Sequence, residues 1–207
     1  MMPRSRTLTA IALAVLVGLG ACSTSAPPTR LHTLMPAEPT PREPSAAGRG
    51  LVFVTLAPIR LPAQVDQPQW LVRLPDETLA SLEQERWASP LADELRQALL
   101  EQLSARFGVV EGRHVAPQAA APVGIALEFR RFDSIPGREA RIEGVWTVAG
   151  ASPGRCDFLI RESAAAGMAE LAAAHRRALA RLAAAIGASL VAVPPASAPA
   201  CPAREPR

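Results

Sequence analysis

Alternating hydrophobic and polar positions predict three consecutive strands in the second half of the chain. Apolar side chains recur at every second residue through Val123–Arg130, Arg141–Val148 and Cys156–Arg161. Such alternation is typical of strands that bury one face and expose the other. Turn-forming residues at Pro136-Gly137 and Ser152-Pro153-Gly154 separate the three strands. The pattern therefore predicts an antiparallel meander with one buried face.

Shorter apolar runs predict further strands nearer the N-terminus. Leu51–Leu56 is rich in β-branched residues and is closed by Pro58, which is typical of a short buried strand. Trp70–Leu74 predicts a second strand, and Thr78–Glu83 predicts a third beyond the turn Pro75-Asp76-Glu77.

Leucines that recur every four residues predict the first helix, with an apolar stripe formed by Leu91, Leu95, Leu99 and Leu103. We expect Ser89 to be the N-cap and Pro90 to occupy the first helical position. Asp93 and Glu94 follow in the first turns, where acidic side chains favour a helix, and Gly108 fits the C-terminal cap.

A second, alanine-rich helix is predicted over Gly167–Ala192. One side of it carries mainly large apolar residues, at Met168, Leu171, His175, Leu179, Leu182, Ile186 and Leu190. Strand blocks separated by two amphipathic helices predict an α+β domain. We expect a single domain over 51–192, with an antiparallel sheet and both helices packed on one of its faces.

The segments on either side of this domain differ from it in composition. Residues 22–50 are rich in proline, which favours an extended tether. Within it, Leu31, His32, Leu34 and Met35 could pair as a short strand at the domain edge. Residues 193–207 form a Pro/Ala-rich tail that we expect to be disordered.

The first 21 residues have the pattern of a lipoprotein signal peptide. Arg4 and Arg6 precede an uncharged apolar run over Thr7–Ala21, which is too short to span a bilayer as a helix. The run ends in Leu19-Gly20-Ala21-Cys22, which matches the bacterial lipobox. We expect cleavage before Cys22 and acylation of that residue, because two or three acyl chains make a stable membrane anchor.

Ser23 bears on the destination of the lipoprotein. In enterobacterial sorting, an aspartate directly after the lipidated cysteine retains a lipoprotein in the inner membrane. By that resemblance, Ser23 predicts an outer-membrane location on the periplasmic face.

Composition and charge exclude several classes of function. The chain has 207 residues, 49% of them hydrophobic, and a formal net charge of +3. All the positive charges are arginines, and removal of the signal peptide takes away two of them, so neither nucleic-acid binding nor electrostatic steering is indicated. Hydrolase, nucleotide-binding and zinc-protease motifs are absent from the sequence, and no lysine could form a Schiff base. We expect no enzyme, no cofactor and no metal.

The few histidines and cysteines allow structural roles. No metal-ligand partner lies at helical spacing from His32, His114 or His175, which we interpret as structural or partly exposed. Cys156 and Cys201 remain after acylation of Cys22, and in an oxidising periplasm they could form a disulfide. The alternative is one buried thiol and one free thiol in the tail, and the sequence leaves this open.

Three short segments combine aromatic residues with charge or proline. They supply our candidate partner-binding residues: Asp66, Pro68, Gln69, Trp70, Arg86, Trp87, Arg131, Phe132 and Asp133. Tryptophan and arginine are enriched at interface hot spots. The competing interpretation is structural, with Trp87 packed over a helix start and with Asp66 and Asp133 closing turns.

At these segments the chain resembles the ABC-type transport auxiliary lipoproteins, specifically members similar to paraquat-inducible protein C. The family loop L-P-x-Y-L-D-R-P-Q-[IL]-V is matched at Leu61, Pro62, Asp66, Pro68, Gln69 and Val72. The family's R-W-A-E-P-L corresponds to Arg86–Leu91, with serine in place of glutamate. Its R-F-D…G…W pattern corresponds to Arg131–Asp133, Gly137 and Trp146. Gln64, Val65 and Gln67 depart from the loop's Tyr, Leu and Arg.

The resemblance implies a periplasmic lipoprotein that serves a transporter rather than catalysing a reaction. It also implies partnership with MCE proteins, which form lipid-carrying tunnels, and with their inner-membrane transporter, as well as ring-like homo-oligomers. The sequence hypothesis is therefore an outer-membrane-anchored accessory subunit of an MCE-type lipid transport system. The alternative is an envelope lipoprotein that itself binds or chaperones a lipid or an envelope precursor, which would need an apolar cavity.

Overall fold

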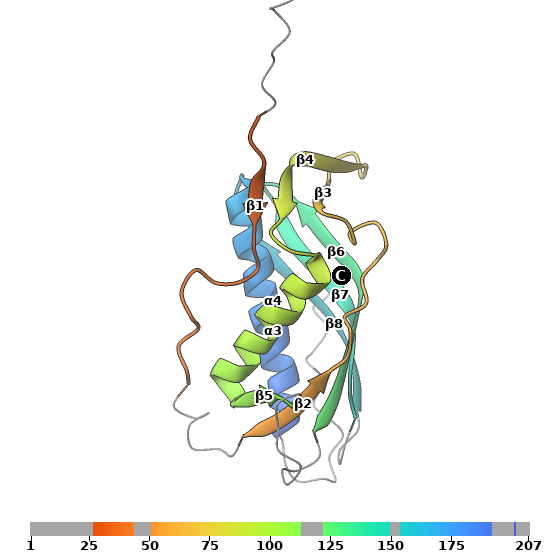
Figure 1. The fold of residues 1–207 in the computed structure, drawn as a ribbon. Helices are drawn as coiled ribbons and strands as arrows, with labels where there is room; N and C mark the ends of the chain where they lie inside the picture. Colours follow the sequence, from red (N-terminus) through yellow and green to blue (C-terminus); the bar gives the residue numbers. More distant parts are fainter. Residues whose placement is uncertain (1–26, 44–50, 113–121, 150–153, 192–200, 202–207) are drawn as a thin grey trace, which may run out of the picture.

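A computed structural model describes residues 27–43, 51–112, 122–149, 154–191 and Cys201. The predicted signal peptide, Cys22, His114 and the rest of the tail lie outside these residues. Two helices, α3 (Leu91–Phe107) and α4 (Met168–Val191), cover one face of a five-stranded sheet, and a smaller sheet lies at one end (Figure 1). The predicted α+β class is confirmed. Within the described residues, no helix is long and apolar enough to cross a membrane.

The five-stranded sheet contains the predicted meander. Its strand order is β5-β2-β6-β7-β8, with bounds Val109–Glu111, Val52–Leu56, Val123–Ile135, Glu139–Ala149 and Gly154–Ser163. β6, β7 and β8 pair antiparallel in sequence order, as their alternation predicted. Gly137 has a φ of 71° in the turn that joins β6 to β7, a conformation that favours glycine.

The smaller sheet has the order β1-β4-β3, with bounds Arg30–His32, Leu79–Trp87 and Gln69–Arg73. β3 and β4 form an antiparallel hairpin, and β1 is a short edge strand that contains Leu31 and His32 but not Leu34 or Met35 of the proposed pairing segment. The expected single antiparallel sheet is therefore wrong in two respects, because there are two sheets and both contain parallel pairs.

The parallel pairs arise from long connections that alternation cannot reveal. β2 lies parallel to both β5 and β6, and β1 lies parallel to β4. The connection from β2 to β5 contains α3, and a crossover of this length is what parallel strands require. β5 has only three residues, too few for a periodic pattern.

The core lies between the helices and the inner face of the large sheet. Trp146, Ile142 and Phe158 from the sheet are buried against α4, whose apolar stripe is buried at Leu171, Leu179, Leu182 and Ile186. The stripe predicted for α3 is buried at all four leucines. Gly108 forms the expected C-terminal cap, with a φ of 66°.

The start of α3 differs from the expected cap. The N-cap is Pro90, which makes no side-chain cap hydrogen bond. Ser89 instead donates from its hydroxyl to the carboxylate of Glu94 at 2.8 Å. Glu94 also accepts from the backbone N–H of Leu34 at 2.8 Å and from the hydroxyl of Thr33 at 2.7 Å. Glu94 is therefore a buried carboxylate that fastens a distant segment to the helix.

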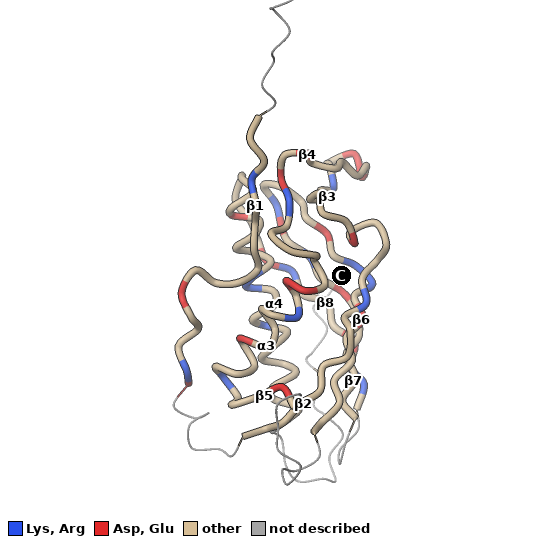
Figure 2. Tube along the Cα trace, viewed as in Figure 1, with Lys and Arg blue, Asp and Glu red and all other residues tan. Residues whose placement is uncertain are grey.

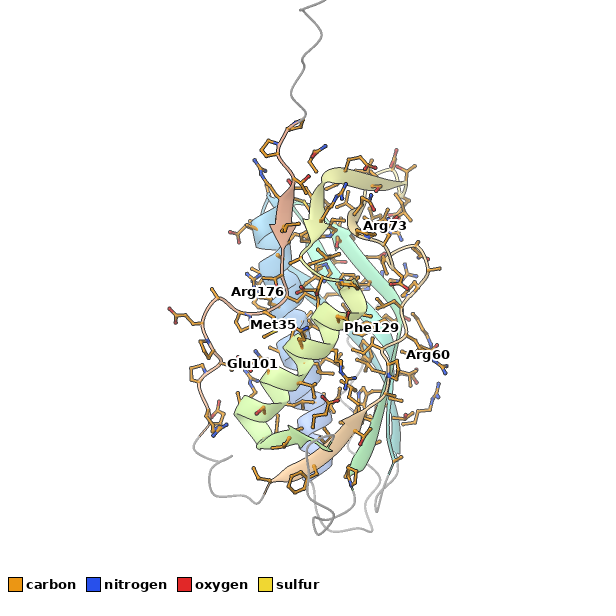
Figure 3. The ribbon with its side chains drawn as sticks, in the orientation of Figure 1. Met35, Arg60, Arg73, Glu101, Phe129 and Arg176 are labelled. Carbon is orange, nitrogen blue, oxygen red and sulfur yellow. A yellow bond between two sulfur atoms is a disulfide. The ribbon has the colours of Figure 1, made fainter. Side chains whose placement is uncertain are left out.

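That segment, residues 27–43, lies within the tether predicted over 22–50 but is packed against the domain. Leu34 is buried in the core, and the backbone N–H of Thr40 donates to Glu101 at 3.1 Å. Arg176 of α4 donates to the carbonyl of Thr33 at 3.1 Å. Met35, Glu101 and Arg176 lie along this crossing in Figure 3. We call residues 27–43 the N-terminal segment, and it is part of the folded domain.

Candidate functional site

The structure brings the three aromatic segments together in one buried cluster. The rings of Trp70 and Trp87 have centroids 4.2 Å apart, and Phe132 stacks on His175 at 4.2 Å with an interplanar angle of 6°. All four side chains are buried. The cluster joins the small sheet to β6 and α4. In this arrangement Trp70, Trp87 and Phe132 hold the domain together and do not form an exposed surface.

Hydrogen bonds run through this cluster. The indole Nε1 of Trp70 donates to the hydroxyl of Ser134 at 2.8 Å, and that hydroxyl lies 2.8 Å from Nε2 of His175. Burial lowers the pKa of His175 to about 3, so its ring is neutral at ordinary pH. The sequence did not predict Ser134. It placed His175 on the apolar stripe of the helix but left open whether the ring is buried, and the structure buries it completely. Because the pair is buried, a substrate cannot reach it in this chain.

Asp133 lies in a polar network on the outer face of the large sheet, away from the helices. Its carboxylate accepts from Arg73 at 3.0 Å and from Arg131 at 3.2 Å. Arg131 also lies 3.5 Å from the carboxylate of Glu143, which is 3.6 Å from Arg141. Asp133 therefore belongs inside β6 and does not close a turn. Residues of both charges are interspersed over the described chain, and neither sign dominates a face (Figure 2).

The remaining candidate residues stay at the surface. Asp66 and Pro68 are exposed in the connection between β2 and β3, and Gln69 and Arg86 are half-buried. The backbone N–H of Trp87 donates to the carbonyl of Pro68 at 3.1 Å, which holds this connection against the end of β4. Pro68, Gln69 and Arg86 are thus brought together, with Asp66 two residues before Pro68 in the same connection, whereas Arg131 belongs to the outer face of the sheet.

An open groove of about 350 Å³ lies on that outer face, and the sequence did not predict it. β6, β7 and β8 form its floor, and residues 57–60 form one wall by pairing with β6. The lining residues are Ala57, Pro58, Arg60, Ala126, Leu127, Glu128, Val145, Thr147 and Arg155. Arg60 and Arg155 are exposed, and Arg60 projects away from the helices (Figure 3). The groove combines two cations with small apolar residues.

In the structure a disulfide joins Cys156 of β8 to Cys201, with Cα atoms 5.3 Å apart. The sequence left open whether these residues pair. No group of three or more metal-ligating side chains occurs among the described residues.

The family model described as the ABC-type transport auxiliary lipoprotein component matches residues 32–187. The chain belongs to this family. The match contains both sheets from His32 of β1 onward, α3, nearly all of α4 and every candidate partner-binding residue. No curated protein matches the chain.

Two solved structures share the fold of this family member. A crystal structure of an uncharacterized protein has a TM-score of 0.62 and 16% identity, covering 78% of this chain and 97% of that one. Protein XCC0632 from Xanthomonas campestris, of the DUF330 family, has a TM-score of 0.57 and 20% identity, covering 79% of this chain and 95% of that one. The family comprises auxiliary components of transport and is not an enzyme family. Its description as a lipoprotein component associates it with the cell envelope.

Proposed function

We propose that this chain is an accessory subunit of an MCE-type intermembrane lipid transport system. In this proposal Cys22 carries the lipid anchor and holds the chain at the periplasmic face of the outer membrane. The folded domain binds the MCE tunnel protein or its inner-membrane transporter, and so supports outer-membrane integrity. We further propose that it acts as a homo-oligomer, without catalysing a reaction. Membership of the transport auxiliary lipoprotein family is the observation that carries this proposal.

We propose the outer face of the sheet as the partner-binding surface. The aromatic members of the candidate set are buried, and of the accessible members only Arg131 lies on this face. Asp66, Pro68, Gln69 and Arg86 form a separate accessible group at the β2–β3 connection and the end of β4. The groove on this face is lined by two exposed arginines, Arg60 and Arg155. Arginine is a residue type that interface hot spots favour.

The alternative, a lipoprotein that itself carries a lipid, has weaker support. Such a carrier would enclose acyl chains in a largely apolar cavity. The groove on the sheet is open and is lined by Arg60, Glu128 and Arg155 as well as apolar residues. This lining fits a polar protein partner better than an acyl chain.

The test is affinity capture of the full-length lipoprotein from the native envelope after mild solubilisation. The wild-type chain should capture an MCE-domain protein, and the double variant Arg60→Glu/Arg155→Glu should lose most of that capture. Arg138→Glu is the matched control, because it reverses an exposed arginine at the β6–β7 turn, outside the groove. Absence of any MCE protein from the wild-type sample would contradict the proposed function. Lipid that copurifies with the chain would instead favour the carrier alternative.

A further inference from the structure

The distance between the proposed anchor and the folded domain is short. Because the N-terminal segment is packed along α3, only Cys22 to Thr29 precede β1. Fully extended, this stretch reaches roughly 28 Å at about 3.5 Å per residue. The sequence predicted a tether over all of residues 22–50. The start of β1 must therefore stay close to the membrane that holds Cys22.

The direction of β1 decides which end of the molecule is held there. β1 runs parallel to β4, with Arg30 beside Glu85 and His32 beside Trp87. The chain that precedes Arg30 therefore points back along β4 toward its first residue, Leu79. Consistent with this direction, the hydroxyl of Thr29 lies 3.3 Å from the side-chain oxygen of Gln84. The anchor thus leaves from the end that carries the β3–β4 turn, at the top of Figure 1.

This end carries exposed leucines. Leu31 of β1 is 66% exposed, and Leu74 and Leu79, on either side of the β3–β4 turn, are 38% and 44% exposed. A fourth exposed leucine, Leu51 at 62%, directly precedes β2 at the opposite end of the molecule (Figure 1). Transfer of exposed leucine side chains from water into a bilayer is energetically favourable.

Charge at this end does not indicate an electrostatic attraction to an anionic surface. Arg30 and Arg73 lie there, but Asp76, Glu77 and Glu83 are exposed around the same hairpin. Contact with a membrane would thus depend on apolar side chains and on the anchor, and not on basic residues that bind acidic lipids.

We infer that the end formed by β1 and the β3–β4 turn lies against the bilayer that holds Cys22. Leu31, Leu74 and Leu79 enter the boundary between headgroups and acyl chains. This inference rests on the proposed anchoring at Cys22. The anchor supplies the affinity and the leucines fix the orientation, so the groove on the outer face of the sheet lies to one side of the membrane contact and stays open to a partner.

The test uses full-length lipoprotein with a cysteine introduced at Leu79, labelled with an environment-sensitive fluorophore. Acylation of Cys22 and the Cys156–Cys201 disulfide leave this residue as the free thiol. In phosphatidylcholine vesicles that contain a spin-labelled quencher lipid, the label should lose more than half its fluorescence. Leu51→Cys is the matched control, because Leu51 is also an exposed leucine but lies at the far end, and its label should be unaffected.

The outcomes separate this inference from the anchoring on which it rests. Mass spectrometry and vesicle flotation establish whether the chain is acylated and membrane-bound. A chain that floats but whose label at position 79 is quenched no more than that at position 51 overturns the inference alone. A chain that is neither acylated nor floats overturns both the anchoring and the inference. Near-ultraviolet circular dichroism of the buried tryptophans checks that both variants remain folded.

Discussion

At the scale of single residues, His175 is a buried base whose neutral form the fold requires. Burial lowers its pKa from 6.5 in the unfolded chain to about 3, so below pH 6.5 the unfolded state binds a proton that the folded state does not. The free energy of unfolding should therefore be unaffected by this group above pH 6.5. It should fall as the pH drops from 6.5 toward 3.

We predict that this group alone removes about 2 kcal/mol of stability between pH 7 and pH 5. Urea unfolding at the two pH values measures the loss in the wild-type chain. His175→Gln cannot titrate there, so it should be less stable at pH 7 but should lose about 2 kcal/mol less on acidification. Equal losses in the two chains would show that His175 is protonated in the folded state.

The aromatic cluster could be predicted only in part from the sequence. The sequence singled out Trp70, Trp87 and Phe132 as residues of note, and the structure gathers them around His175. The sequence left open whether these aromatic residues bind a partner or pack in the core, because an aromatic side chain suits a core as well as an interface. That choice depends on which segments meet in space, and Ser134, the hydrogen-bonding centre of the cluster, has no local pattern to reveal it.

At the scale of elements, α3 and α4 approach each other closely at a glycine. A Cβ added to Gly187 of α4 would overlap the ring of Phe107, the last residue of α3. Gly187→Ala would normally stabilise a helix by about 1 kcal/mol. Here we predict a net loss of about 1–3 kcal/mol, because the aromatic ring must be displaced. Denaturant unfolding measures the difference.

A double-mutant cycle isolates this contact. In a Phe107→Ala background the added methyl group has room, so Gly187→Ala should be neutral or stabilising there. If Gly187→Ala destabilises both backgrounds equally, the close approach of the two helices is not the cause.

Element prediction succeeded where burial is periodic and local. β6, β7, β8, α3 and α4 were all anticipated within a few residues, because one face of each is buried. The three-residue strand β5 was not predicted from the sequence, and neither was the parallel pairing of β2. Both depend on contacts between residues far apart in the chain. The helix start at Pro90 differed because Glu94 is satisfied by Ser89, Thr33 and Leu34, two of which belong to the N-terminal segment.

At the scale of the whole molecule, the Cys156–Cys201 bond closes a loop that contains α4, between cysteines 45 positions apart in the sequence. A closed loop of this length restricts the unfolded chain and stabilises the folded one by about 4 kcal/mol on the chain-entropy account. We predict that Cys201→Ser lowers the free energy of unfolding by up to about this amount. Denaturant unfolding with and without dithiothreitol checks it, since reductant should affect only the wild-type chain. A wild-type chain that is insensitive to the reductant would contradict the pairing.

The two ends of the molecule carry different features. The start of β1 and the β3–β4 turn form one end (Figure 1). The groove lies on the outer face of the sheet, over the start of β6, the end of β7 and the start of β8. A membrane-bound chain could therefore hold a partner along its side without moving its anchor.

The parallel pairing of β1 with β4 also has a mechanical consequence. Tension between an anchor at Cys22 and a partner on the sheet would pull β1 along its own axis. The backbone hydrogen bonds to β4 would then be loaded together in shear, and not opened one after another. The hydrogen bonds from Thr33 and Leu34 to Glu94 follow β1 directly along the chain and would share this load. Forced unfolding is governed by the rate of unfolding, so the force that this three-residue strand withstands would depend on how slowly these hydrogen bonds break in shear.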